Sequence, residues 1–126
     1  MKVFIIDDDP EEIEFMIEAL YEIHPSIESQ VCTDPEAALV LLAGASVAPD
    51  IILLDNMMPT FNAVEVIDKL MRLPTLVKSK IVVLSCDVNP NDTEVMKGLF
   101  VPIFKKDNTF SGMVETLRTI ILGAVG

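Results

Sequence analysis

Three short apolar runs without polar alternation constrain the fold of this chain more than any other feature. They are VFII at 3–6, IILL at 51–54 and IVVL at 81–84. Strands of a parallel sheet are apolar throughout because helices cover both faces of the sheet. A strand with one face in water alternates apolar and polar residues. Helical patterns separate the runs. The sequence therefore predicts an α/β fold built from βα units.

Two further segments are expected to be edge strands. Residues 27–32 alternate in polarity, and residues 101–104 include Pro102, which has no N–H for a sheet ladder. Edge positions for the second and fifth strands are what the order 2-1-3-4-5 requires. We therefore predict a flavodoxin-like (βα)5 doubly wound parallel sheet with the strand order 2-1-3-4-5.

The helices have recognisable beginnings. Asp9-Pro10 and Asp34-Pro35 each place a capping carboxylate before a proline that suits the first helical position. Apolar residues spaced by three and four predict a first helix from Pro10, a third from about Ala63 and a last from Phe110. A short fourth helix is expected near residues 92–99.

Composition sets limits on the class of protein. A chain of 126 residues with 51% hydrophobic residues is expected to form one domain over residues 1–126, with no output domain after the last helix. A net charge of −11 argues against a direct nucleic-acid partner. The absence of a long apolar run predicts a cytoplasmic protein with no membrane partner. Cys32 and Cys86 have no metal-type or disulfide-type spacing.

Polar residues stand where four of the expected strands end. They are Asp7, Asp55, Ser85 and Lys106. The carboxyl ends of parallel strands meet at one edge of the sheet, which is where such folds bind ligands. Carboxylates can bind a hard divalent cation, and a carboxylate is also an adequate nucleophile towards phosphorus. The set predicts a site for phosphorylation of a carboxylate with the help of a metal.

The motifs that carry these residues are VFIIDDDP, PDIILLDNMMP, VVLSCD and FKKD. In this order and spacing the chain, from Met1 to about Leu122, resembles a receiver domain of a two-component response regulator. The resemblance implies that Asp55 is the phosphoacceptor. It also implies a Mg²⁺ site in which Asp8 and Asp55 bind the ion directly, Asp7 binds it through water, and the carbonyl of Met57 supplies a further ligand.

Two more roles follow from the resemblance. Ser85 would contact the bound phosphoryl group, and a lysine at the end of the fifth strand would pair with it. Lys105 and Lys106 both stand there, and the spacing from Ser85 favours Lys106.

The resemblance also implies partners. A sensor histidine kinase or a histidine phosphotransfer protein would donate the phosphoryl group, and a downstream target or an output domain, on another chain or a missing segment, would respond. Residues 92–122 would form the output face, and the last helix is a candidate surface for a homodimer. The domain would catalyse only its own phosphorylation and dephosphorylation, so it is not expected to be an enzyme in the usual sense.

Two alternatives to a phosphorylated receiver stay open, the first because of departures from the family pattern. Ala63 stands where the family usually has glycine, Asp107 where it has proline, and Cys86 where a small residue is usual. Because of Ala63 and Cys86, a pseudo-receiver that works without phosphorylation is the first alternative. The second is a phosphatase of the haloacid dehalogenase type, whose DxD pattern Asp7-Asp8-Asp9 matches, although Pro10 does not fit that pattern.

Overall fold

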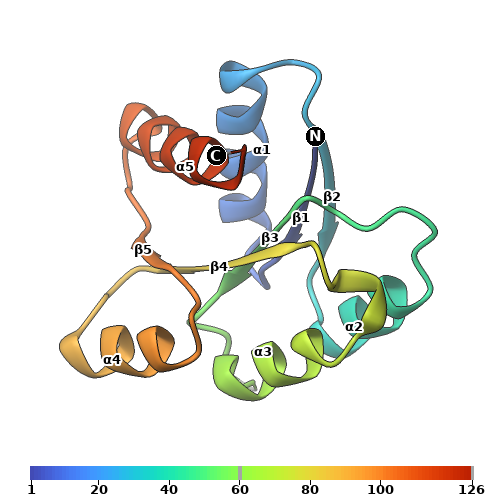
Figure 1. Ribbon diagram of the computed structural model, residues 1–126. Helices are drawn as coiled ribbons and strands as arrows, with labels where there is room; N and C mark the ends of the chain where they lie inside the picture. The colour runs from blue at the N-terminus through green and yellow to red at the C-terminus, as the bar shows by residue number, and fades with distance from the viewer. Residues whose placement is uncertain (60, 126) are drawn as a thin grey trace.

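A five-stranded parallel sheet between two layers of helices forms the centre of the protein (Figure 1). The computed structural model describes residues 1–59 and 61–125. The strands are β1 (Lys2–Ile6), β2 (Glu28–Cys32), β3 (Ile51–Asp55), β4 (Lys80–Ser85) and β5 (Ile103–Lys105). They lie in the order β2-β1-β3-β4-β5, and all four neighbouring pairs are parallel. The predicted fold class and strand order are confirmed.

The helices begin where their capping residues stand. They are α1 (Pro10–Ile23), α2 (Pro35–Ala43), α3 (Ala63–Met71), α4 (Pro90–Gly98) and α5 (Phe110–Val125), with a 3₁₀ turn η1 (Pro74–Leu76) before β4. Asp9 and Asp34 cap α1 and α2 as predicted. Helix α4 begins two residues before the predicted start because Asn89 caps it, accepting the N–H of Asp92 at 2.8 Å. In the part of the chain that the structure describes, no helix is long and apolar enough to cross a membrane.

The fifth strand begins later than the sequence suggested. Pro102 lies just before β5 rather than inside it. Its carbonyl still accepts the N–H of Val83 at 2.9 Å, so the proline extends the pairing with β4 without needing a donor of its own. This strand is at the edge of the sheet, where only β4 pairs with it.

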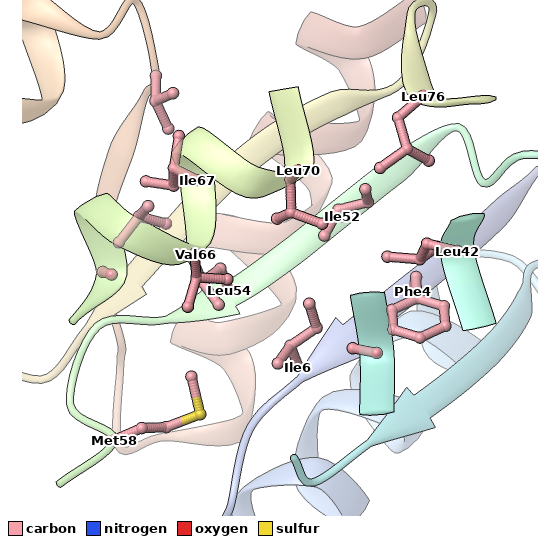
Figure 2. Packing of buried hydrophobic residues seen from close by; sticks show 14 of the residues in the cluster. Phe4, Ile6, Leu42, Ile52, Leu54, Met58, Val66, Ile67, Leu70 and Leu76 are labelled. Atoms are coloured by element: carbon pink, nitrogen blue, oxygen red, sulfur yellow. The ribbon is translucent and has the colours of Figure 1, made fainter. Parts of the chain in front are cut away.

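Each central strand contributes side chains to two hydrophobic cores. Val3 and Ile5 point to the layer of α1 and α5, whereas Phe4 and Ile6 point to the layer of α2, α3 and α4. Figure 2 shows the second core, in which Leu54, Val66 and other apolar side chains meet between the sheet and α3. Burying an aliphatic side chain contributes roughly 1.5–3 kcal/mol, so these cores hold the strand ends in fixed relative positions.

Candidate functional site

Four polar side chains are buried together at the carboxyl edge of the sheet. Asp7 follows β1, Asp55 and Ser85 end β3 and β4, and Lys106 follows β5. Among the described residues these are the polar or charged side chains classed as buried, with exposures of 9% or less. Buried charges are costly unless they are paired or serve a function. The structure thus brings together the four strand-end residues that the sequence singled out.

Lys106 links the site through three carboxylates. Its Nζ lies 2.9 Å from Asp55 Oδ1 and 3.1 Å from Asp7 Oδ2, and it also donates to Glu12 Oε2. An ammonium group has three N–H donors, so all of them are in use. The pairing holds Lys106 Nζ directly against the Asp55 carboxylate.

The backbone explains why Lys106 rather than Lys105 occupies the site. The N–H of Lys106 donates to the carbonyl of Ser85 at 2.8 Å, which continues the pairing of β5 with β4 by one residue. Successive side chains of an extended segment point to opposite sides. Lys105 is therefore exposed while Lys106 is buried.

The electrostatics of the site are dominated by excess negative charge. Burial raises the pKa of Asp7 to about 7, and the charge of Asp55 adds to this, while the Asp9 N–H and Lys106 oppose it. Burial alone would lower the pKa of Lys106, but its hydrogen bonds with Glu12 and Asp55 outweigh that effect and raise the pKa above its usual value. Lys106 therefore stays charged, whereas Asp7 can keep a proton close to neutral pH.

The acidic side chains are close enough to share a cation. Carboxylate oxygens of Asp7, Asp8 and Asp55 all lie within 4.8 Å of one another. Mg²⁺ binds oxygen ligands at about 2.0–2.1 Å in an octahedron. Two oxygens bound to one ion are therefore no farther apart than about twice that bond length, which is compatible with the spacing of these carboxylate oxygens. The single positive charge of Lys106 does not offset the negative charges of these three carboxylates and Glu12. The donor set, which is all oxygen, fits Mg²⁺.

Met57, on the loop after β3, and Ser85, the last residue of β4, lie beside Asp55. The Met57 N–H donates to Asp55 Oδ1 at 3.1 Å, and its side chain is 54% exposed. The Ser85 hydroxyl donates to the carbonyl of Asp87 at 2.9 Å. Ser85 would therefore have to turn away from this carbonyl in order to contact a group bound to Asp55.

Glu12 is the site residue that the sequence analysis missed. It lies in the first turn of α1, and its side chain is 33% exposed. Its Oε1 also lies 3.8 Å from the thiol of Cys86, an exposed residue of the loop after β4. No local pattern links Glu12 to the site, because Asp7 and Asp8 lie before the helix cap and Lys106 is 94 residues away. In the sequence Glu12 stands three residues after the Asp9 cap, which is the position of the glutamate in a capping box.

Comparison with known families agrees with this geometry. The sequence matches the family described as "Response regulator receiver domain" over residues 3–118. The chain belongs to this family. Receiver domains are signalling modules of two-component systems rather than conventional enzymes, and as a class they interact with histidine kinases and output domains. The match favours this interpretation over the phosphatase alternative.

Solved receiver structures have the same fold. The phosphorylated cyanobacterial phytochrome response regulator RcpA is 29% identical, with a TM-score of 0.81 over 94% of this chain and 89% of that one. The Mn²⁺-bound response regulator Rcp1 is 22% identical, with a TM-score of 0.79 over 94% and 90%. RPA3017, a response regulator in red light signalling of R. palustris, is 19% identical, with a TM-score of 0.83 over 94% and 90%. A search of curated proteins found no match.

Proposed function

We propose that this receiver domain is a cytoplasmic phosphorylation switch that accepts a phosphoryl group on Asp55 in a Mg²⁺-dependent reaction. The donor is a phosphohistidine of a sensor histidine kinase or of a histidine phosphotransfer protein. The observation that carries the proposal is the contact of Lys106 Nζ with Asp55 Oδ1 at 2.9 Å, beside three carboxylates within 4.8 Å of one another. RcpA, the relative at 29% identity, is phosphorylated in its crystal structure.

The transfer is a displacement at phosphorus. A carboxylate oxygen of Asp55 forms the new P–O bond as the P–N bond breaks, and the leaving imidazole nitrogen keeps the electron pair and is protonated. Asp8, Asp55 and the carbonyl of Met57 would hold Mg²⁺, with Asp7 acting through water. When bound, the ion offsets negative charge on the oxygens of the transferred group.

Two residues of the chain then act on the phosphoryl oxygens. Lys106 donates an N–H to one of them, at the cost of one of its present carboxylate contacts. The Ser85 hydroxyl leaves the Asp87 carbonyl and donates to another. Both residues sit on the β4–β5 pairing, so their movement biases α4, β5 and α5 between two arrangements. A downstream target or an output domain would read that face.

Intact mass spectrometry tests the proposal. The protein is incubated with acetyl phosphate and Mg²⁺, with and without chelator, as wild type and as Asp55→Asn. We expect a gain of one phosphoryl group that requires metal and Asp55. Asp50→Asn is the matched control, because Asp50 immediately precedes the other end of β3 and its carboxylate accepts the N–H of Lys2.

Two results would contradict the proposal. The first is a lack of adduct both with acetyl phosphate and with a phosphorylated histidine phosphotransfer protein, which would support the pseudo-receiver alternative. The second is an adduct that persists in Asp55→Asn, which would place the acceptor elsewhere.

A further inference from the structure

A concave surface lies at the amino-terminal end of the sheet, opposite the phosphorylation site. It is an apolar groove of about 500 Å³ at the amino-terminal ends of β4 and β5, bordered by η1, the α4–β5 loop and the last turns of α5. Buried Leu76, Val101 and Ile120 line it. Phe100 and Val77, which also line it, are 93% and 83% exposed. The phosphorylation site is at the opposite, carboxyl edge of the sheet, so this groove is separate from that site. The β5 and α5 side of the groove belongs to the proposed output face, so the inference below rests on the proposed function and specifies a partner for that face.

Phe100 has a backbone conformation that does not favour its side chain. Its N–H donates to the carbonyl of Lys97 at 3.1 Å. The N–H of Val101 donates to the carbonyl of Met96 at 3.0 Å. These bonds form a Schellman motif at the end of α4, in which the residue at the position of Phe100 is usually glycine because φ is positive. Phe100 has a φ of 58°. Neither helix termination nor packing explains a phenylalanine here, since glycine would end the helix better and the ring is almost fully exposed.

The surroundings of the groove are basic, in contrast to the rest of the chain. The sequence has 20 acidic and nine basic residues. No Asp or Glu stands within two positions of a residue that lines the groove, whereas five exposed basic residues near its end of the sheet do: Lys69, Arg72, Lys78, Lys80 and Arg118. Arg72 is paired with Asp68 at 3.2 Å. Lys78 and Lys80, which flank the lining residue Ser79, make no ion pair among the described residues.

We propose that this groove docks an acidic segment of a partner protein, which inserts an apolar side chain between Phe100 and Val77. Charge complementarity selects this occupant. In a two-fold dimer the basic rim would meet a copy of itself, which is repulsive. A lipid surface is flat and would leave the concave groove unfilled.

Binding of a designed probe tests the proposal. The probe is a fluorescein-labelled amphipathic peptide of Leu, Phe, Glu and Ala, and the control peptide has Lys in place of each Glu. We expect anisotropy to show that the acidic peptide binds, that the Lys peptide does not, and that salt weakens the complex. Amide NMR shifts should gather on residues 76–82, 100–104 and 119–124.

Phe100→Gly separates recognition from folding. Glycine suits the positive φ, so the thermal midpoint should stay the same or rise, while the affinity for the acidic peptide falls by about tenfold or more. Lys78→Glu should also weaken binding. The matched controls are Val40→Ala, which trims a 74% exposed apolar side chain of α2, and Lys2→Glu, which makes the same charge change on β1. Both controls should bind normally.

Several outcomes would overturn the proposal. They are no binding of the acidic peptide, equal binding by Phe100→Gly, and NMR shifts confined to other surfaces. Self-association in light scattering that Phe100→Gly abolishes would show that a second copy covers the groove. Preferential binding to phosphatidylserine vesicles would show that a lipid surface covers the groove. Phosphorylation of Phe100→Gly should equal that of wild type, so failure here leaves the proposed function intact.

Discussion

At the scale of single residues, Lys106 has to contact three carboxylates now and a phosphoryl oxygen after transfer. Its three donors are taken by Asp7, Asp55 and Glu12, so an incoming phosphoryl oxygen can receive an N–H only if one contact is released. Asp7 and Asp55 are almost fully buried, and losing a charged partner there is costly. Glu12 is 33% exposed at its side chain and can be hydrated instead. Glu12 is therefore the contact that we expect to break.

Glu12→Gln should speed phosphorylation of Asp55. The amide keeps the size of the side chain but loses its charge, which weakens the contact that Lys106 has to give up. A gain of about 1 kcal/mol at the transition state corresponds to roughly fivefold in rate. The measurement is the rate of adduct formation with acetyl phosphate at saturating Mg²⁺. Glu14→Gln is the control, because Glu14 is exposed on the same helix. An unchanged or slower rate in Glu12→Gln would refute this role.

At the scale of elements, Asp107, Thr109 and Gly112 are linked at the beginning of α5. The Asp107 carboxylate accepts from the N–H and hydroxyl of Thr109 at 2.8 and 2.7 Å, and these bonds lower the pKa of Asp107. The Thr109 hydroxyl oxygen in turn accepts the N–H of Gly112 at 3.1 Å. A Cβ on Gly112 would lie 2.1–2.4 Å from the Asp107 carboxylate. Glycine is thus required as long as the aspartate keeps this position.

The effect of Gly112→Ala should therefore depend on residue 107. In an Asp107→Ala background the substitution should stabilise the protein by about 0.5–1 kcal/mol, because alanine is the better helix former. In the wild-type background the new methyl group displaces the Asp107 carboxylate, and the gain should vanish or change sign. Urea denaturation of the four proteins of the cycle measures this. Equal effects in both backgrounds would show that the two residues are independent.

The elements differ in how far the sequence revealed them. Central strands and the first two helix beginnings were predictable because apolar runs, Asp9 and Asp34 act locally. Bringing the strand-end residues together required only the strand order. The contact of Glu12 with Lys106, which are 94 residues apart, depends on how α1 packs against the end of β5. The steric need for Gly112 likewise depends on the position of one carboxylate, which no local pattern records.

At the scale of the whole molecule, the site lowers the stability of the domain that carries it. The net charge is −11, and Asp7 is buried at 1% exposure beside Asp55. Burial raises the pKa of Asp7 to about 7, whereas the unfolded chain has the ordinary value of 3.8. From about pH 4 to about 7 the folded protein therefore keeps a proton that the unfolded chain has lost. The Asp7 contribution to stability consequently decreases as pH rises through this window.

Asp7→Asn should remove this pH dependence. Its amide is neutral at every pH, so the variant should be more stable than wild type by about 1–3 kcal/mol at pH 8 without metal, and nearly equal to it at pH 4. Urea unfolding followed by circular dichroism measures the difference. Mg²⁺ should narrow the gap at pH 8, since a bound cation offsets the ionised carboxylate in the wild type.

The surface variant Glu18→Gln controls for the loss of one negative charge from the acidic helix α1, where Glu18 is exposed. Its stability should differ little from wild type at either pH, because an exposed carboxylate is solvated in both states. A stability gain for Asp7→Asn that is the same at pH 4 and pH 8 would show that burial of the Asp7 charge is not the cause. A loss of stability at pH 8 would mean that the contact with Lys106 outweighs the cost of burying the Asp7 carboxylate, and that the domain does not sacrifice stability to keep its acidic site.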